Sequence, residues 1–515
     1  MKHWIYICFL VLLSACDNML DVEPENSVTF TNYFESEKDM NALTIQLHSF
    51  FRTKLHDTDV ASYRGLILDE LSNTSMNAQR ELNFGEVANV KSRLNSWKFH
   101  YDVIYVANVI LDNMHRVKDI TDARRDFHEG QAYFCKAMAY FDLVRKWGEC
   151  VIIKNSTEVK VRAKSTVSEV LDYAIECAEE AYKRLPKYED LKDIAGNPIV
   201  QKQYGSKGST AALLAHAYAW KGSVAELCEL DDDIKLCYEK AIEWSSLLLD
   251  DTYKAEVGDY RLESTPEEMC VNAFNYPNTS KEVILEFQLD EYATSASTFT
   301  PMKYYLAWPV DLLRKENDIQ TKTQFRLKLG TIAEMYEAED KRPDAYFYKF
   351  DSLCQARGMD WYAYPYMSRE GQYVTNASGT LRFSYLKTNY CYWRVADIYL
   401  LRAECYAKLN DDRAIADLNQ VRRRANAAAY PSSRDSKGIQ DAIFREREKE
   451  MLMEGHRYFD VVRNGLPYIN NELQGNFSIL SLQDVKDGAL YMPVSEAAFT
   501  LNDLMRQNKF WQQYM

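Results

Sequence analysis

Aromatic side chains gather in two parts of the sequence, and their chemistry suits the binding of a ligand. Nine of the 28 residues in 346–373 are Tyr, Phe or Trp, against an aromatic content of 13% over the whole chain. A second group consists of Phe299, Tyr304, Tyr305 and Trp308. Such rings offer flat apolar faces for stacking and polar tips for hydrogen bonds, which is how sugar rings can be held. We therefore expect at least one exposed aromatic platform; the alternative is that the rings only form a core for the loops.

The densest cluster of charged and aromatic residues lies at 446–460. Catalysis here would pair His456 with Glu454 or with Asp460 as general acid and base. No nucleophile or second His accompanies them in this segment. We interpret the cluster as a helix whose Glu and Arg residues form a structural ion-pair network, with Tyr458 and Phe459 facing the core.

The sequence lacks the motifs that mark several classes of function. The chain has no phosphate-binding loop, nucleophile elbow, zinc-protease motif or dinucleotide fingerprint, and its eight His form no ligand pair. The formal charge of −14 argues against nucleic-acid binding. The nine Cys after Cys16 make no CxxC pair, so we expect them to be packing residues. We expect no catalytic residue, metal or cofactor, although a glycosidase that uses two carboxylates leaves no local signature.

The N-terminus predicts a lipid anchor. Lys2 precedes a run of ten apolar residues at 4–13, and small residues then lead to Cys16. This is the pattern of a signal peptide over 1–15, and ten apolar residues are too few to span a bilayer, which needs about 20. Leu-Ser-Ala-Cys at 13–16 resembles a bacterial lipobox, in which acyl chains such as palmitate are attached to Cys16. The alternative is a plain signal peptide with a chance Cys.

Most of the chain has the apolar spacing of helices. Helices are expected at 38–55, 97–117, 122–147, 165–185, 206–222, 232–250, 393–409, 411–426 and 438–463, and strands at 151–153 and 283–288. Four helix pairs, with small residues at the crossings, are typical of tetratricopeptide-type hairpins. We predict a mostly α fold, an α-α superhelix scaffold with a large loop-rich ligand-binding subdomain. Residues 16–515 form a single unit, with scaffold mainly at 38–250 and 391–463 and loop-rich insertions mainly at 56–96, 251–390 and 464–495.

Short motifs occur in order along nearly the whole chain, at 20–24, 97–108, 132–148, 394–404, 418–425, 446–463, 491–494 and 507–508. Each is weak alone, but together they make the chain resemble the SusD/RagB-like outer-membrane nutrient-binding lipoproteins of Bacteroidota. The segment 446–463, with the pattern E-R-x-x-E-x-x-x-E-G-H-R-Y-F-D, is the most specific. The chain departs from the family pattern at Cys150, Glu448 and Ser495, none of which is an expected ligand contact.

The resemblance implies a non-catalytic lipoprotein of the outer membrane, exposed at the cell surface. It would act as a lid on a SusC-like TonB-dependent transporter, with its helices facing that partner and glycans captured on the opposite, loop-rich face. Trp308, Tyr304, Tyr305, Trp361 and Tyr362 are the ligand-binding candidates from aromatic density. The loop position that the resemblance implies adds Asn77 and Arg80. Two alternatives remain: the same fold binding peptides, or a surface glycoside hydrolase on a helical scaffold.

Overall fold

The structure is a computed structural model that describes residues 33–54, 64–71, 74–85, 96–274, 278–287, 309–316, 325–500 and 502–514. The predicted signal peptide and Cys16 lie outside these ranges. Within them, no helix combines the length and the apolar character needed to cross a membrane.

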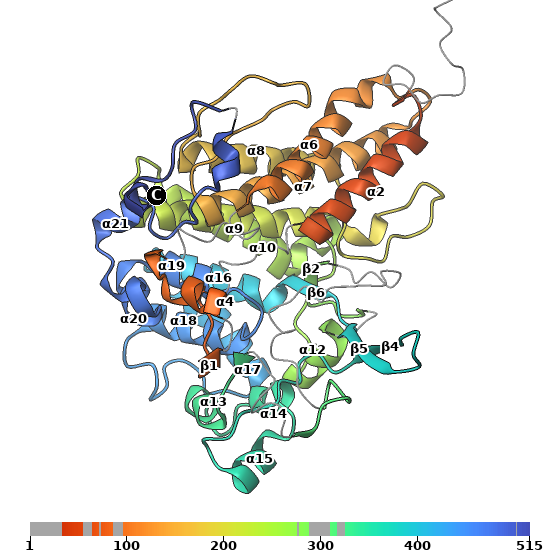
Figure 1. The fold of residues 1–515 in the computed structure, drawn as a ribbon. Coiled ribbons are helices and arrows are strands. Elements are labelled where there is room, and N and C mark those ends of the chain that lie inside the picture. The colour runs from red at the N-terminus through yellow and green to blue at the C-terminus, as the bar shows by residue number, and fades with distance from the viewer. Residues whose placement is uncertain are drawn as a thin grey trace, which may run out of the picture.

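Long helices form the upper half of the molecule in Figure 1. They are α2 (Glu37–Lys54), α6 (Lys98–Asn113), α7 (Asp122–Trp147), α8 (Val167–Arg184), α9 (Lys207–Cys228) and α10 (Ile234–Leu249). A second group follows later in the chain: α16 (Val395–Lys408), α17 (Arg413–Ala425), α18 (Ile439–Glu450), α19 (Arg457–Arg463), α20 (Leu466–Glu472) and α21 (Leu482–Lys486). The four predicted pairs pack as α2 with α6, α7 with α8, α9 with α10, and α16 with α17. The mostly α, tetratricopeptide-like fold is confirmed.

The sequence marks several helix ends by capping. Thr166 and Glu169 form a capping box that satisfies free N–H groups at the start of α8, and Asp233 caps α10. Gly148 ends α7 with a φ of 73°, a conformation that glycine adopts without strain.

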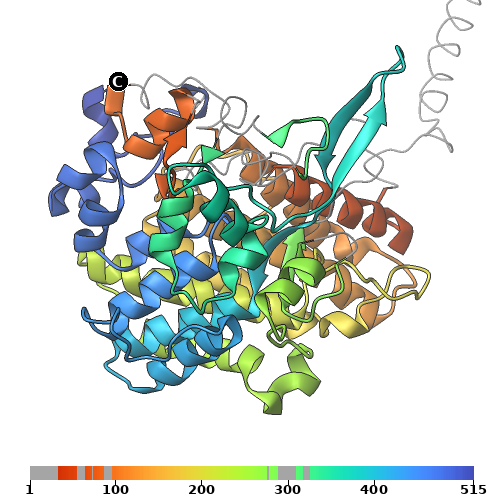
Figure 2. The same ribbon diagram turned by 90° about the horizontal axis from the view of Figure 1, so that it is seen from below.

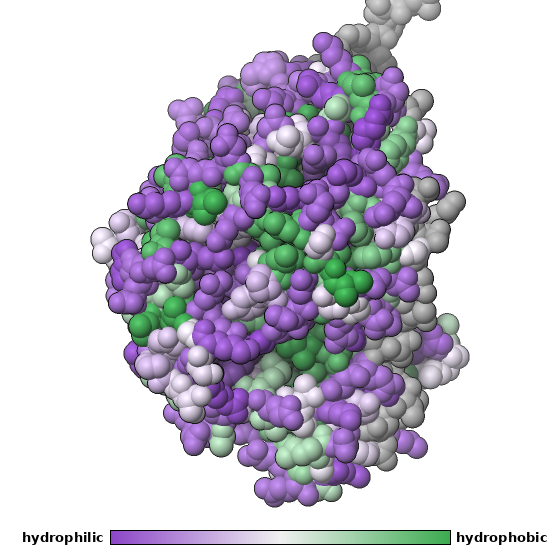
Figure 3. Space-filling model, turned by 90° about the vertical axis from the view of Figure 1, so that its left-hand side faces the viewer, coloured by the Kyte–Doolittle hydropathy of each residue, from purple (hydrophilic) through white to green (hydrophobic). Residues whose placement is uncertain are grey.

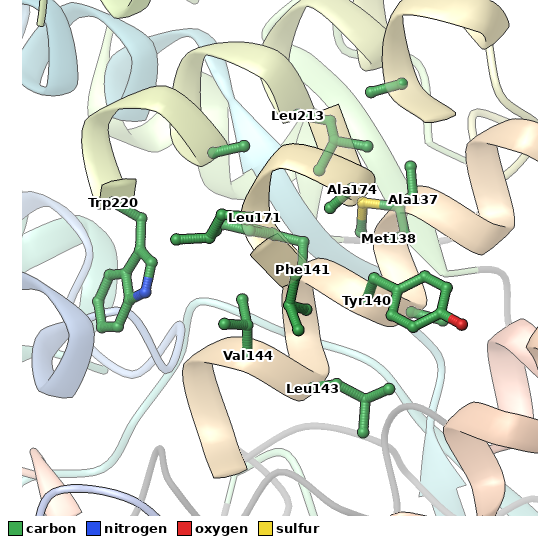
Figure 4. Packing of buried hydrophobic residues seen from close by; sticks show 14 of the residues in the cluster. Ala137, Met138, Tyr140, Phe141, Leu143, Val144, Leu171, Ala174, Leu213 and Trp220 are labelled. Carbon is green, nitrogen blue, oxygen red and sulfur yellow. The ribbon is translucent and has the colours of Figure 1, made fainter. Parts of the chain in front are cut away.

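The main core lies where α7, α8 and α9 meet. Figure 4 shows Phe141 and Val144 of α7, Leu171 of α8 and Trp220 of α9 pointing into the same space. All four side chains are buried. Each buried large side chain contributes about 1.5–3 kcal/mol by leaving water, so this junction stabilises the scaffold.

Gly222 lets α9 and α10 approach closely. A Cβ atom at this position would lie 3.1 Å from Cβ of Cys237 and 3.1 Å from the ring of Tyr238. We expect Gly222→Leu to lower the free energy of unfolding by about 1–3 kcal/mol through overpacking, measurable by thermal unfolding. Glu239→Leu adds the same side chain at an exposed site on α10 and is the control, and equal melting temperatures for the two variants would contradict this prediction.

Four sequence expectations were wrong in detail. The helix predicted at 206–222 continues to Cys228. Residues 393–394 end a strand, so the helix predicted at 393–409 begins at Val395. The helix predicted at 438–463 is broken between Glu450 and Arg457, where Met453 and Gly455 have positive φ. Residues 151–153 form no strand. The N–H groups of Val151 and Ile153 donate to the hydroxyls of Tyr101 and Tyr140, at 2.9 and 2.8 Å, instead of to a neighbouring strand.

The loop-rich part has short elements, several of which surround a second core. Its helices are α4 (Thr74–Glu81), α11 (Lys254–Val257), α12 (Pro266–Ala273), α13 (Leu329–Met335), α14 (Arg342–Tyr346) and α15 (Phe350–Arg357). Strands pair antiparallel as β1 (Glu70–Leu71) with β3 (Phe325–Arg326), β2 (Val283–Phe287) with β6 (Tyr390–Arg394), and β4 (Gly371–Thr375) with β5 (Leu381–Leu386). The β4–β5 hairpin projects from the body in Figure 2. Tyr346, Phe347 and Tyr364, from the aromatic-rich segment, are buried in this core.

Buried ion pairs join the loop-rich part to α18. Arg394 is fully buried and lies 2.9 Å from Glu282, 2.6 Å from Glu450 and 2.8 Å from Glu454. Burial raises the pKa of Glu450. The positive charges of Arg424, Arg394 and Arg342 outweigh this effect and lower the pKa to about 2.

A second buried network lies beside the first. Arg447 bridges Asp397 at 2.6 Å and Asp460 at 2.9 Å, while Tyr458 and Phe459 are buried. Burial lowers the pKa of His456 to about 4. The expected ion-pair network is present, with Tyr458 and Phe459 facing the core, but 446–460 is not one continuous helix.

Candidate functional site

Three extended segments lie side by side and position the candidate rings. The N–H of Asp69 donates to the carbonyl of Arg326 at 2.9 Å, next to the β1–β3 pairing. Further along, the N–H of Leu329 donates to the carbonyl of Trp361, and that of Ala363 to Leu327, both at 2.8 Å. Residues 69–71, 325–329 and 361–363 therefore form one small layer, although the first and last are nearly 300 residues apart in sequence.

Tyr362 is held by two groups from the other segments. Its hydroxyl donates to the Glu70 carboxylate at 2.7 Å, and Arg326 donates to the same oxygen at 2.8 Å. The guanidinium of Arg326 also lies 5.5 Å from the centre of the Tyr362 ring. Burial and the Glu70 carboxylate raise the pKa of Tyr362, so this half-buried ring stays a neutral hydrogen-bonding group.

Trp361 contacts a different set of residues. Its indole N–H donates to the hydroxyl of Tyr364 at 3.3 Å, and the guanidinium of Arg357 lies 4.9 Å from the ring centre. Arg357 is itself 3.3 Å from the carboxylate of Glu316. The indole is half-buried, and its position is fixed by contacts on its edge and on one face.

The two rings do not form one continuous wall. Successive side chains of an extended segment point to opposite sides, and Trp361 and Tyr362 accordingly have separate partners. Each ring is immobilised by neighbours before any ligand arrives, which lowers the entropic cost of stacking. The two rings are therefore held at separate positions, each with a charged side chain beside it.

Asn77 and Arg80 lie on α4, the helix that follows β1. Asn77 is half-buried. Arg80 is 8% exposed and donates to the side-chain oxygen of Gln474. The structure thus brings Arg80 against the segment that follows α20, and Asn476 further ties that segment to α4 through the carbonyl of Leu82 at 3.0 Å.

The remaining predicted ligand residues, Tyr304, Tyr305 and Trp308, lie outside the described residues. Sequence reasoning missed Glu70, Arg326 and Arg357, which hold the two described rings in place. No local pattern identifies them, because Glu70 and Tyr362 are 292 residues apart in sequence and meet only through the layer of three segments.

The cysteines contribute no visible chemistry in the described part of the chain. Nine free thiols are present there, seven buried and two half-buried. Burial raises the pKa of Cys150 to about 12 and that of Cys270 to about 12, which makes them unreactive. This burial agrees with their predicted packing role. Among the same residues, no three His, Cys, Asp or Glu side chains are placed to hold a metal ion.

Two family models match this chain. The model described as "SusD family" matches residues 306–511, and the one described as "Starch-binding associating with outer membrane" matches residues 18–195. A SusD-like protein of Formosa agariphila is 24% identical over 501 residues, covering 89% of this chain and 91% of that protein. A SusD-like protein of Bacteroides ovatus is 22% identical over 526 residues, covering 93% and 86%.

Solved structures share the fold over nearly the whole chain. A SusD homologue of Bacteroides thetaiotaomicron has a TM-score of 0.72 at 20% identity, covering 93% of this chain and 99% of that one. NanU of B. fragilis has a TM-score of 0.68 at 18% identity, covering 95% and 100%. These structures show the shared fold, and the two family models and the curated relatives support the assignment of this chain to the SusD/RagB-like family.

Proposed function

We propose that this protein is a cell-surface lipoprotein that binds an oligo- or polysaccharide and delivers it, without catalysis, to a SusC-like TonB-dependent transporter. Cys16 carries the lipid that anchors it to the outer membrane. Proteins of this family are nutrient-binding proteins that work with SusC-like transporters, and one matching family model is described as associating with the outer membrane. These facts support the role, while the ligand class rests on the aromatic residues.

The observation that carries the ligand class is the fixed position of Trp361 and Tyr362. Both rings are half-buried and are held by neighbouring polar side chains in the loop-rich part. A sugar can stack on such a ring while its hydroxyls bond to groups such as Glu70 and Arg326. Trp308, Tyr304, Tyr305, Asn77 and Arg80 are proposed to complete the site.

Replacing Trp361 with alanine is expected to weaken glycan binding by about 1–3 kcal/mol, because one ring contact is lost. The measurement is calorimetry on the whole chain in detergent, with a saccharide first identified on a glycan array. Trp308→Ala is expected to act in the same direction. Tyr105→Ala removes a ring that is 58% exposed on α6, away from the loop-rich part, and is the matched control. Unchanged affinity in both tryptophan variants would refute this site.

The same experiment separates the alternatives. A chain that shortens the bound saccharide, and loses this activity on substitution of one Asp or Glu, would be a glycoside hydrolase. A chain that binds peptides but no saccharide on the arrays would overturn the proposed ligand class while leaving the fold and the family unaffected.

A further inference from the structure

One side of the layer of three extended segments faces away from the second core. The layer lies in the lower half of Figure 1, where β1 and α13 are labelled. Phe325, Leu327 and Leu329 belong to that core, and successive side chains of an extended segment point to opposite sides. Arg326 and Lys328, which alternate with them, therefore lie on the outward side of the layer.

Pairing places three more side chains on this outward side. Residues directly opposite each other in an antiparallel pair lie on the same side. Glu70 is opposite Arg326, and Tyr362 is opposite Lys328. Asp360 comes two residues before Tyr362 and accepts a hydrogen bond from the ammonium of Lys328 at 2.9 Å. The outward side thus contains an aromatic ring with two ion pairs around it.

Both ion pairs keep hydrogen-bonding groups that a ligand can use. Oε2 of Glu70 accepts from Tyr362 and Arg326, while its Oε1 has no partner among the described residues. Oδ1 of Asp360 accepts from Lys328, and its Oδ2 likewise has no partner in the described part of the chain. The side chains of Glu70, Lys328 and Asp360 are 44, 40 and 99% exposed. A ligand on the ring can therefore reach two acceptor oxygens and an ammonium group.

The outward side has no surplus of positive charge. The two carboxylates and the two cations of the ion pairs cancel. At the edge of the layer, Asp69 adds a carboxylate that accepts a backbone N–H and a hydroxyl and forms no ion pair with a described residue. Burial raises the pKa of Tyr362 most, and Glu70 raises it further by more than Arg326 lowers it. Nothing on this side would attract an anion.

Exposed charge alone does not distinguish this side of the layer. Hydrophilic residues also predominate, with hydrophobic ones between them, on the face drawn in Figure 3. The distinguishing feature is a fixed ring beside unused acceptors and donors. A sugar hydroxyl both donates and accepts, so it can bond to the carboxylates and to the ammonium. A carboxylate or sulfate group only accepts, and it would meet the like charges of Glu70 and Asp360.

We propose that the outward side of this layer binds an uncharged saccharide and selects against carboxylate and sulfate groups. A sugar ring stacks on Tyr362, while its hydroxyls donate to Glu70 and Asp360 and accept from Lys328. Lys328 and Asp360 are thereby added to the ligand contacts. The inference rests on the proposed function and narrows its ligand class to neutral glycans.

The first test is an array of neutral, uronic-acid and sulfated glycans, probed with the whole chain in detergent. We expect the bound glycans to be uncharged, and tighter binding of acidic glycans would overturn the inference while leaving the proposed function in place. Asp360→Lys makes the outward side positive and should increase the binding of acidic glycans relative to neutral ones. Asp231→Lys makes the same change on the exposed loop between α9 and α10 and should not. Equal behaviour of the two variants would contradict the selection by charge.

Calorimetry with a neutral glycan that the array identifies tests the two added contacts. Asp360→Ala and Lys328→Ala are each expected to weaken binding about three- to tenfold, the scale of one hydrogen bond. Asp231→Ala and Lys160→Ala, at exposed positions on other loops, are the matched controls. If all four variants bind alike while Trp361→Ala weakens binding, this inference fails and the proposed function stands. If no saccharide binds at all, both fail.

Discussion

Arg394→Ala is expected to lower the free energy of unfolding by about 3–5 kcal/mol, the largest effect predicted for this chain. The guanidinium is fully buried and lies against the carboxylates of Glu282, Glu450 and Glu454. It also donates to the backbone carbonyl of Glu450 at 2.6 Å. Removing it leaves three buried carboxylates without this partner, and the cost of an uncompensated buried charge exceeds that of most single substitutions.

Chemical unfolding of the whole chain, followed by tryptophan fluorescence, measures this loss. Arg413→Ala is the matched control, because Arg413 pairs with Asp411 at 2.6 Å but its side chain is 68% exposed. Exposed pairs contribute about 0–1 kcal/mol, so the control should stay close to the unsubstituted chain. Equal effects of the two substitutions would show that the buried network does not stabilise the fold.

Glu454→Gln is expected to flatten the dependence of stability on pH between about 5 and 7. Burial raises the pKa of Glu454 to about 7, and Glu450 and Glu282 act in the same direction against Arg394. The unfolded carboxyl titrates at its ordinary value, near 4.3. Between these values the folded chain keeps a proton that the unfolded chain releases.

The sign of the pH dependence follows from this difference in proton binding between the folded and unfolded chain. The stabilising contribution of Glu454 is complete below its pKa in the unfolded state. It is lost, by about 1.4 kcal/mol per pH unit, as the pH rises through its pKa in the folded state. The Gln side chain cannot titrate but keeps an acceptor for Arg394. Free energies of unfolding measured across this range should therefore fall less steeply in Glu454→Gln than in the unsubstituted chain. Glu339→Gln, at an exposed position, is the control, and an unchanged slope in Glu454→Gln would contradict the prediction.

Much of the scaffold could be predicted because helices are local structures. Apolar spacing placed α7 at its observed bounds and α2, α8 and α10 within two residues at each end. The errors came where tertiary contacts replaced a local preference. Tyrosine hydroxyls took the hydrogen bonds of the strand expected at 151–153, and positive φ at Met453 and Gly455 broke a helix whose composition is helical apart from that glycine.

The candidate site was less predictable than the scaffold. Aromatic density identified the segment 346–373, but the structure buries Tyr346, Phe347 and Tyr364 in the second core and leaves Trp361 and Tyr362 half-exposed. Which ring faces solvent depends on which segments lie beside it. The density of aromatic residues along the chain does not indicate which ring faces solvent.

By itself, the sequence determined the helical hairpins, the family and the structural character of the charged segment at 446–460, because these follow from periodicity and from motifs within a few turns of chain. Only the tertiary structure decided that Glu70 and Arg326 hold Tyr362 and that Arg394 joins three carboxylates. Those contacts join residues tens to hundreds of positions apart. Their partners are chosen by the packing of whole elements, which no local pattern records.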